Sequence, residues 1–509
     1  MTARLLGLDL GTSSLKALIV DAAGRAAGVG IAEYPIHRPH PDHAEQDPED
    51  WWRAAATAVR QAVAAAPGLA DEVVAIGLTG QMHGTVVLDR SLQPLAPAII
   101  WPDRRSERQV QTITTTIGAE RLVQIAGSPV ATGFQAATLC WLRDEQPALW
   151  RAVRHVLLPK DYLRWRLTGQ LSTDPSDAAG TLLLDARARR WSETILSALD
   201  LDARMLPEIV PSTHVVGRLT PPAAAHLGLP AGIPVVQGAA DTAASALGTG
   251  IVSPTTLLIT VSTGGQLVLP TTDVSIDVRG RIHTFCSALE PGSGVAAWYQ
   301  MAATLCAGMA MRWLRDQVFG ITSPDAYTLM SEWAAESPPG AGGLVFLPYL
   351  VGERSPHMDP AARGMFLGLN ARHGRAELVR AVMEGITLSC YDAYAVLAEL
   401  GARPQRVILS GGGVRSRLWQ RIFADVFNLP LQRPTVSEQS ALGACLLAGA
   451  GVGLFDLVDA ATRWATFEPA VTPQAQRHAS YMELLGIFRD AYRNNTSAFR
   501  HLRDYDRGS

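Results

Sequence analysis

The sequence predicts a mixed α/β fold with two related halves, and three observations support this prediction. Apolar runs at 5–10 and 15–20 flank a small polar turn, which is a strand–turn–strand pattern. The same pattern returns at 255–261 and 266–269 around a second polar turn. Helical patterns lie between the strand runs, as a sheet covered by helices requires. The two turns are too far apart for a short structural repeat, so we expect two related halves.

The first half begins with three predicted strands, a helix and a further buried strand. The turn Gly11-Thr12-Ser13-Ser14 joins two strands of a hairpin, and a third strand is expected at 29–34. An Ala-rich helix is expected from Pro48 to about residue 66, with Asp47 as its N-cap. A buried strand at 73–78 then leads into the glycine-bounded loop 80–84.

The second half repeats this order. A short strand at 232–237 precedes Asp241, which opens a run of small residues typical of a helix start. The second hairpin turns at Ser262-Thr263-Gly264-Gly265. A helix at 377–400 and a strand at 406–409 lead to Gly411-Gly412-Gly413. We expect further helices at 416–427 and 439–447.

Composition excludes several classes of protein. The 509 residues carry 44 Lys+Arg against 47 Asp+Glu, so a general nucleic-acid binder with a basic stripe is not expected. Every long apolar run is interrupted before 18 residues, so we expect no membrane span. The 5 cysteines are scattered without CxxC spacing, which excludes a disulfide framework and a thiolate zinc site. No signal peptide is visible, and we expect a cytoplasmic enzyme.

The first polar turn is suited to nucleotide phosphates. Asp9 lies at a strand end beside a turn rich in backbone N–H and hydroxyl donors, and such a carboxylate can hold Mg²⁺ through water. The alternative is an ordinary hairpin turn with a solvated Asp. The second turn at 262–265 and the triple glycine 411–413 favour a bound nucleotide, with adenosine lying against the glycines. The chain contains no P-loop sequence.

Three further residues have both a functional and a structural interpretation. Asp241 at a helix N-terminus would remain ionised and accept a hydroxyl proton, or it would simply cap the helix. His83 would contact a polar ligand from its loop, or it would be a structural histidine. Trp101 would belong either to a site or to the core.

Together these motifs resemble the FGGY carbohydrate kinases, most closely the xylulokinase branch. The resemblance runs in order from about residue 4 to residue 450. The motifs that carry it, of which Gln-Met-His-Gly and Gly-Glu-Arg-Ser-Pro-His are the most specific, are Leu8-Asp9-Leu10-Gly11-Thr12-Ser13, Gly80-Gln81-Met82-His83-Gly84, Trp101-Pro102-Asp103-Arg104, Leu158-Pro159-Lys160-Asp161-Tyr162-Leu163, Ser176-Asp177-Ala178-Ala179-Gly180-Thr181, Phe346-Leu347-Pro348-Tyr349-Leu350, Gly352-Glu353-Arg354-Ser355-Pro356-His357 and the stretch from Gly364 to Gly385.

The resemblance implies two actin-like, ribonuclease-H-like domains, at 1–245 and 246–509, with a nucleotide and sugar cleft between them. It implies transfer of the ATP γ-phosphate to a ketopentose, converting D-xylulose to D-xylulose 5-phosphate. Asp241 would be the catalytic base, and Asp9 would hold Mg²⁺ through water. The sugar would contact Gln81, Met82, His83, Asp241 and Thr242. ATP would contact Thr12, Ser13, Lys16, Thr263, Gly264, Gly411, Gly412, Gly413 and Ser416.

Three positions depart from the family pattern. Thr242 stands where the best-known bacterial xylulokinases have Asn, Thr138 stands where the first signature usually has Lys, and the second turn reads Ser-Thr-Gly-Gly. Thr242 leaves open another pentulose or a sugar alcohol as the substrate. A different class also stays open, an actin-like or heat-shock-type ATPase switch. Apart from ATP and a sugar, the partner we expect is a second copy of the chain in a homodimer.

Overall fold

The computed structural model describes residues 3–508, which form two compact units. The first unit contains the chain up to Ser253, Pro270–Tyr299 and Val436–Thr466, and the second contains Pro254–Leu269, Gln300–Thr435 and the chain from Phe467 onward. These units are interleaved along the sequence, whereas the predicted domains 1–245 and 246–509 are contiguous. That division stays a prediction, and its outermost residues, 1–2 and 509, lie outside the described residues.

The first unit is built on a mixed sheet with strand order β13-β14-β5-β1-β2-β3, and β15 pairs with β5. The predicted hairpin is confirmed, because β1 (Arg4–Leu10) pairs antiparallel with β2 (Ser14–Asp21). The predicted third strand is β3 (Ala26–Glu33), antiparallel to β2. The predicted buried strand is β5 (Val73–Gly80), which runs parallel to β1.

Helix α1 (Pro48–Val63) covers one face of this sheet. Its N-cap is Asp47 as predicted, with the carboxylate accepting the Glu49 N–H at 2.9 Å. Alternate β1 residues Leu6 and Leu8 share a fully buried core with this helix. The helix approaches β3 so closely that a Cβ on Gly30 would lie 1.9 Å from the carbonyl oxygen of Ala58.

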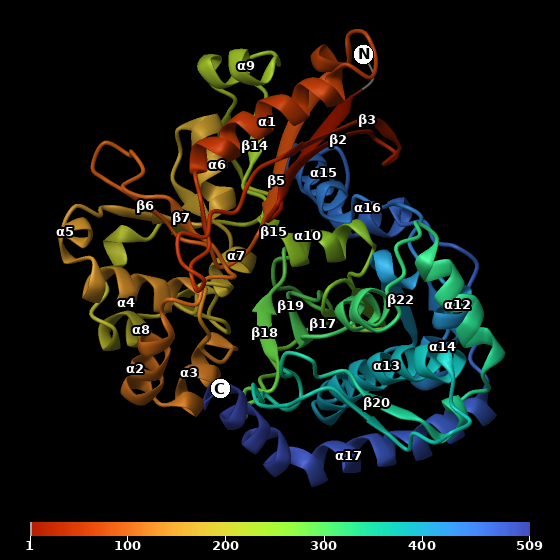
Figure 1. Cartoon of the computed structure of the whole chain (residues 1–509). Coiled ribbons are helices and arrows are strands. Elements are labelled where there is room, and N and C mark those ends of the chain that lie inside the picture. Colours follow the sequence, from red (N-terminus) through yellow and green to blue (C-terminus); the bar gives the residue numbers. More distant parts are fainter. Residues whose placement is uncertain (1–2, 509) are drawn as a thin grey trace. The chain divides into compact units, whose positions relative to one another are not determined.

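Helix α15 (Gln439–Gly451) covers the opposite face, although it comes from late in the sequence (Figure 1). A Cβ on Gly7 of β1 would lie 2.1 Å from the Ala441 carbonyl oxygen, and one on Gly77 of β5 would lie 2.0 Å from that of Ala444. Because successive strand residues point to opposite faces, Gly7 faces α15 while Leu6 and Leu8 face α1. This packing explains why Val436–Thr466 belongs to the first unit.

The other elements of the first unit connect or surround this sheet, except β18, which is hydrogen-bonded to β19 (Trp298–Thr304) in the six-stranded sheet. They are β4 (Glu45–Gln46), β6 (Val86–Leu88), β7 (Ala98–Ile99), α2 (Glu107–Ile117), α3 (Ala119–Ala126), α4 (Gln135–Glu145), α5 (Pro147–Trp150), β8 (His155–Leu157), α6 (Pro159–Thr168), β9 (Ser172–Thr173), α7 (Pro175–Ala179), β10 (Leu184–Asp185), β11 (Arg190–Trp191), α8 (Glu193–Ala198), β12 (Glu208–Ile209), β13 (Val215–Arg218), α9 (Pro221–Leu227), β14 (Pro234–Val236), β15 (Ala239–Ala240), α10 (Asp241–Gly248), β18 (His283–Cys286) and α16 (Leu457–Trp464).

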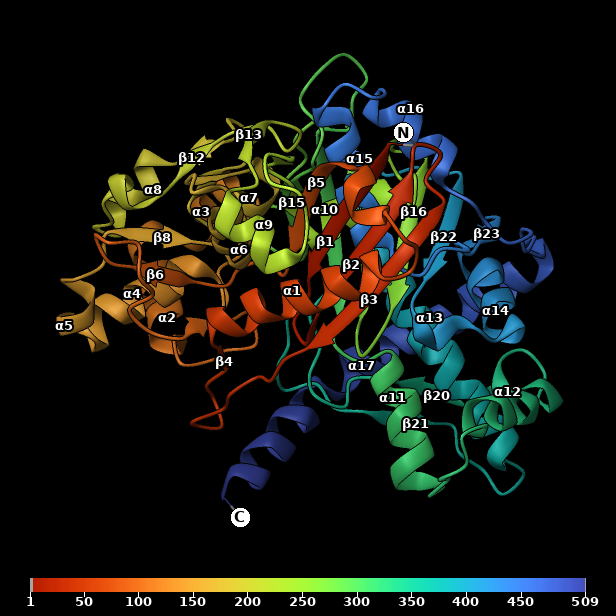
Figure 2. The ribbon, with the colours of Figure 1, turned by 90° about the horizontal axis from the view of Figure 1, so that it is seen from above.

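The second unit repeats the hairpin arrangement of the first. Strand β16 (Thr256–Val261) pairs antiparallel with β17 (Gly265–Thr271) and parallel with β22 (Arg406–Ser410). Strands β19 (Trp298–Thr304), β17, β16, β22 and β23 (Leu431–Gln432) follow one another in this order, and Figure 2 shows β16, β22 and β23 side by side. The predicted relation between the two halves is therefore confirmed.

Long helices pack against this second sheet. The predicted helices at 377–400 and 416–427 are α13 (Arg375–Glu399) and α14 (Arg417–Phe427). The last helix, α17 (Ala475–Gly508), packs against α14 and α13. The remaining elements are α11 (Gly308–Trp313), α12 (Ala326–Glu336), β20 (Val345–Leu347) and β21 (Met365–Leu367). Across residues 3–508, no helix combines the length and apolar character needed to cross a membrane.

Candidate active site

Three strand ends meet at one edge of the first sheet. Leu10, the last residue of β1, lies opposite Gly80 of β5, and Gly80 lies opposite Ala240 of β15. The polar turn after β1, the loop after β5 and Asp241 after β15 therefore leave the sheet side by side. Ligands of open α/β sheets bind at such carboxyl ends of parallel strands. The fold thus brings together predicted residues that are far apart in the sequence.

The turn after β1 is held by side chains from outside the hairpin. Thr12 Oγ1 accepts a hydrogen bond from Trp101 Nε1 at 2.9 Å, and the Thr12 carbonyl accepts one from Gln46 Nε2 at 2.7 Å. Trp101 is 44% exposed, so it is not a core residue. Ser13 is exposed at the tip of the turn. The turn is therefore fixed in place while its outer surface stays accessible.

Lys16 of β2 lies directly opposite Asp9 of β1, because the two residues are paired in the β1–β2 register. Its ammonium group forms an ion pair with Glu438 at 2.6 Å. Glu438 directly precedes α15, so the packing of that helix brings a late carboxylate to the first turn. Lys16 thus lies at the predicted phosphate turn with its charge balanced by an acid that sequence reasoning missed.

Asp9, the predicted metal-binding residue, and Asp241, the predicted catalytic base, both have raised pKa values. Burial raises the pKa of Asp9 to about 7, helped by the negative charges of Asp241 and Glu438 and opposed by Lys16. Burial raises the pKa of Asp241 to about 6, against hydrogen bonds from Thr242 that lower it. Such crowding of acids is relieved by a bound cation, so this donor set fits a divalent metal held by oxygen ligands. Within residues 3–508, no group of three or more His, Cys, Asp or Glu side chains forms a ready metal cage.

Asp241 is the first residue of α10, as the sequence predicted. Its Oδ1 accepts hydrogen bonds from the Thr242 N–H at 2.5 Å and from Thr242 Oγ1 at 3.1 Å. Ser440 Oγ of α15 donates to the Asp241 carbonyl at 3.4 Å. Thr242 therefore orients the carboxylate through its own hydroxyl group.

The loop after β5 carries two predicted sugar residues with different surroundings. Gln81 is 1% exposed, and its Nε2 donates to Gln46 Oε1 at 2.8 Å. Because Gln46 also bonds Thr12, this amide pair links the loop to the first polar turn. Met82 is 6% exposed and packs beside α7, since a Cβ on Gly180 would lie 3.1 Å from Met82 Cε.

His83 is held in an uncommon backbone conformation with a φ of 72°. Its Nδ1 lies 2.6 Å from the carbonyl oxygen of Gly180, and a carbonyl only accepts, so Nδ1 carries the proton. The ring packs on Phe134 with centroids 4.0 Å apart. A left-handed backbone at a non-glycine residue persists only where neighbouring structure enforces it, often at a binding site.

The second unit places the other predicted nucleotide residues. The turn after β16 lies beside the glycines after β22, because Thr260 is paired with Ser410. Thr263 is exposed, and its Oγ1 accepts a hydrogen bond from Arg312 Nη2 at 3.3 Å. A Cβ on Gly264 would lie 2.4 Å from the Thr304 carbonyl oxygen, so the backbone passes there without room for a side chain.

The glycines after β22 border a cavity of about 960 Å³. Gly411 has a φ of 100° and lies against Val261, where a Cβ would be 2.2 Å from the carbonyl oxygen. The cavity lining includes Gly412, Gly413 and Ser416, together with Arg415 and the side chains of Met311 and Tyr327. Ser416 is also the N-cap of α14. The cavity is large enough for a nucleoside.

Comparisons with known proteins give the family. Residues 4–248 match the N-terminal domain, and residues 257–452 the C-terminal domain, of the FGGY family of carbohydrate kinases. The chain belongs to this family. It is 36% identical to the xylulose kinase of Lactococcus lactis over 504 residues, which covers 98% of this chain and 99% of that protein.

Solved structures of FGGY kinases confirm the predicted actin-like α/β fold class. The crystal structure of a xylulose kinase from Brucella ovis has a TM-score of 0.91 at 33% identity and covers 97% of this chain and 100% of that chain. That of a gluconate kinase from Lactobacillus acidophilus has a TM-score of 0.92 at 25% identity, covering 99% and 100%. The fold is therefore shared by kinases named for different sugars, and the choice of sugar depends on the site.

Sequence reasoning missed several residues of this FGGY kinase site. Glu438 could have been found as an acid directly before a predicted helix of small residues. Arg415 could have been found as a cation two residues after the triple glycine. Gln46 and Arg312 had no local signal, because their contacts with Thr12 and Thr263 depend on packing between distant segments.

Proposed function

We propose that the chain transfers the γ-phosphate of ATP to a ketopentose and converts D-xylulose to D-xylulose 5-phosphate. The observation that carries the proposal is the position of Asp241 at the carboxyl edge of the first sheet, where β15 pairs with β5 and β5 pairs with β1. Asp241, the 80–84 loop and the Asp9 turn therefore leave this edge from three neighbouring strands. The similarity to xylulose kinases over nearly the whole chain supports the choice of sugar.

Asp241 acts as the general base in this proposal. With a pKa of about 6, it is largely ionised at neutral pH and still basic enough to take a proton from a sugar hydroxyl. The hydrogen bonds from Thr242 hold the Asp241 carboxylate in one orientation, so the carboxylate needs little rearrangement when the sugar hydroxyl binds. The proton moves from the attacking hydroxyl to Asp241 as the new O–P bond forms, while the bond from the γ-phosphorus to the β,γ-bridging oxygen breaks and ADP leaves with that oxygen.

The sugar is oriented by Gln81, Met82, His83 and Thr242. Gly180 and Phe134 fix the His83 ring, so its hydrogen bond to a sugar hydroxyl forms without loss of side-chain freedom. Met82 supplies an apolar wall. Thr242 has a shorter side chain than the Asn of the family pattern and would therefore reach less far toward the sugar, which affects which pentulose fits.

Asp9 would hold Mg²⁺ through water in this proposal, and its burial beside the negative charges of Asp241 and Glu438, which together raise its pKa, fits such a cation. A Mg²⁺ ion held there would neutralise charge on the ATP phosphates. Thr12, Ser13, Lys16, Thr263 and Gly264 are the residues proposed to bind phosphate oxygens. Lys16 exchanges its contact with Glu438 for phosphate as ATP binds. Gly411, Gly412, Gly413 and Ser416 hold the adenosine at the cavity of the second unit.

A neutral sugar suits the site better than a sugar acid. Burial raises the pKa of Asp9, and the negative charges of Asp241 and Glu438 raise it further. A substrate carboxylate such as that of gluconate would add a like charge and cost binding energy. The negative charge of the site therefore favours ketopentoses and sugar alcohols over gluconate.

The test is ATP-dependent turnover across D-xylulose, D-ribulose, L-xylulose, D-xylitol, D-arabinitol and gluconate, with the product located by ³¹P NMR. We expect the highest kcat/KM with D-xylulose and phosphate on O5. A higher kcat/KM with another sugar would reject the assignment of D-xylulose. Equal ATP hydrolysis with and without any sugar would overturn the kinase proposal in favour of an ATPase switch.

A cytoplasmic location and a homodimer remain predictions. All five cysteines are buried and unpaired, which fits a reducing compartment. Light scattering after size-exclusion chromatography tests the dimer, with a mass near twice 54.4 kDa as the expected result.

A further inference from the structure

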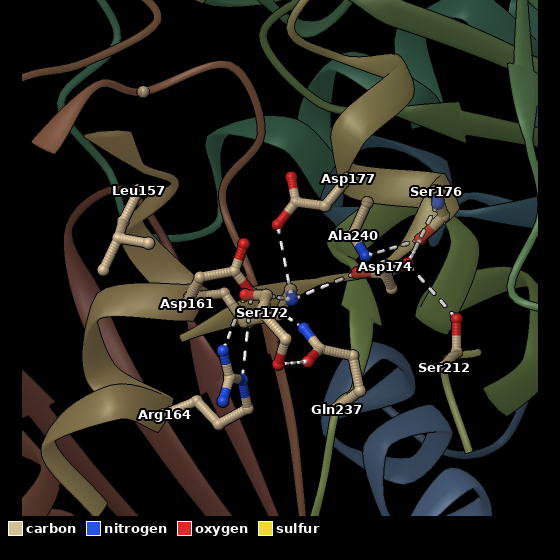
Figure 3. A network of polar contacts seen from close by, with 12 residues as sticks. Leu157, Asp161, Arg164, Ser172, Asp174, Ser176, Asp177, Ser212, Gln237 and Ala240 are labelled. Atoms are coloured by element: carbon tan, nitrogen blue, oxygen red, sulfur yellow. Dashed lines mark hydrogen bonds and ion pairs between the residues drawn. The ribbon is translucent and has the colours of Figure 1, made fainter. Parts of the chain in front are cut away.

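A buried cluster of charges lies in the first unit, near Ala240, the residue before Asp241 (Figure 3). Lys160, Asp161, Asp174 and Asp177 are each 0% exposed, as is Arg164. Lys160 and Arg164 come from α6, while Asp174 caps the N-terminus of α7 and Asp177 lies within it. Burying so many charges is costly, and such clusters are retained in some proteins for conformational specificity.

Lys160 is the centre of this cluster. Its Nζ lies 2.6 Å from Asp161 Oδ1, 3.1 Å from Asp174 Oδ1 and 3.7 Å from Asp177 Oδ2. The three carboxylates outweigh the effect of burial and raise the pKa of Lys160, so it stays charged. Burial and the neighbouring acids raise the pKa of Asp177 well above its usual range, and the positive charge of Lys160 opposes this rise.

Two of these ion pairs fasten the short helix α7 to α6. The first turn of α7 then bonds the segment before Asp241, because Ser176 Oγ accepts the Ala240 N–H at 3.0 Å. Ser176 Oγ in turn donates to Asp174 Oδ2, which also accepts Ser212 Oγ at 3.2 Å. Lys160, Asp174 and Ser176 therefore form a continuous chain of contacts to the backbone at Asp241.

The other end of α7 reaches the candidate sugar loop. Its C-cap Gly180 accepts the Nδ1 proton of His83 at 2.6 Å. Lys160 also lies directly beneath this loop, since a Cβ on Gly80 would be 3.2 Å from Lys160 Cβ. One short helix thus contacts both the base segment and the histidine, and Lys160 holds that helix.

We propose that Lys160 is a positioning residue, which holds α7 through Asp174 and Asp177 and thereby sets the backbone at Asp241 and the ring of His83. The role in catalysis rests on the proposed function, because it assumes that Asp241 is the base and that His83 binds the sugar. The mechanical role, fixing residues 240 and 83 through α7, does not depend on the identity of the substrate.

The test compares Lys160→Met with two matched variants, at a temperature where circular dichroism shows all of them folded. Lys160→Met removes the charge and keeps the length of the side chain. Ser176→Ala removes only the link to Ala240. Arg164→Met removes an equally buried cation that contacts Asp161, 4.0 Å away, and donates to the carbonyl groups of Gln170 and Ser172, none of them on α7.

Steady-state kinetics with the best sugar give the first readout. We expect Lys160→Met to lower kcat about 100-fold and to raise the sugar KM, with the ATP KM unchanged, since small displacements of a base are costly. Ser176→Ala should lower kcat with little change in the sugar KM. Arg164→Met should lower Tm without the change in kcat. A loss of Tm alone in Lys160→Met, with kcat and both KM values as in the wild type, would overturn the proposal.

Hydrogen exchange measured by mass spectrometry gives a readout that needs no substrate. We expect peptides covering 79–84 and 239–242 to exchange about fivefold faster or more in Lys160→Met, and only 239–242 to do so in Ser176→Ala. Unchanged exchange in both peptides would overturn the proposal even if no sugar is phosphorylated. If Lys160→Met does not fold, Ser176→Ala decides alone, and unchanged exchange at 239–242 together with unchanged kcat counts against the proposal.

Discussion

At the scale of single residues, the site depends on carboxylates that burial has made more basic. Asp241 has a pKa of about 6 and lies at the start of α10, with Thr242 bonded to it. We expect Asp241→Ala to lower kcat by about 10²–10⁴ while ATP binding persists, because a general base typically contributes that factor. Turnover measured beside ATP titration calorimetry checks this, and more than a tenth of wild-type kcat would exclude Asp241 as the base.

The raised pKa of Asp9 predicts a pH-dependent requirement for magnesium. Its carboxylate has a pKa of about 7, so below pH 7 protons compete with the metal, and above it they do not. We expect the magnesium concentration for half-maximal activity to rise by up to about tenfold for each pH unit below 7. Asp9→Asn should need more magnesium at every pH and lose this dependence. Identical magnesium titrations at pH 6 and 8 in the wild type would contradict the prediction.

His83 allows substrate binding to be separated from nucleotide binding. Its ring is fixed by Gly180 and Phe134 in the first unit, whereas the candidate adenosine residues belong to the second. We expect His83→Ala to raise the sugar KM about 5- to 150-fold through loss of one hydrogen bond, with a much smaller effect on the ATP KM. Phe134→Leu serves as the control, because it changes the packing around the His83 ring and keeps the histidine itself. Equal changes in both KM values would indicate a structural histidine.

At the scale of elements, close backbone packing places α15 against the first sheet and α10. A Cβ on Gly443 of α15 would lie 1.9 Å from the carbonyl oxygen of Ala244 in α10, so α10 and α15 must move apart when a side chain is added at Gly443. We expect Gly443→Ala to destabilise the protein by about 1–3 kcal/mol, as overpacking usually does.

Gly486 of α17 is the matched control for this substitution, because a Cβ there meets nothing within 4 Å. We expect Gly486→Ala to stabilise by about 0.5–1 kcal/mol through helix propensity. Thermal unfolding of both variants checks the pair. A Gly443→Ala protein as stable as the wild type would show that α15 can move without cost.

At the scale of the whole molecule, the first unit needs a segment from late in the chain. Val436–Thr466 contains α15, whose contacts bury one face of β1 and β5 and bring Glu438 to Lys16. We expect a fragment ending at Ser253 to lack cooperative unfolding, because its sheet would expose that apolar face to water. Calorimetry checks this, and a sharp transition near the Tm of the full chain would contradict it.

The sequence by itself determined the local elements and the family. The β1–β2 hairpin, the Asp47 cap of α1 and the glycine turns were predicted because each depends on neighbours within a few residues. Asp241 at the start of α10 was also predicted, since a strand, a carboxylate and small residues follow one another in the chain. The motifs indicated the FGGY family because they occur along the chain in the order typical of that family.

The tertiary structure decided which distant groups meet. Glu438 reaches Lys16 only through the docking of α15, and Gln46 joins Thr12 to Gln81 only because β1 and β5 are adjacent. The Lys160 cluster forms only because α6 and α7 pack against each other and bury their charged side chains away from water. No local pattern predicts these contacts, because their free energy comes from burial and from pairings that exist only when the whole chain has folded.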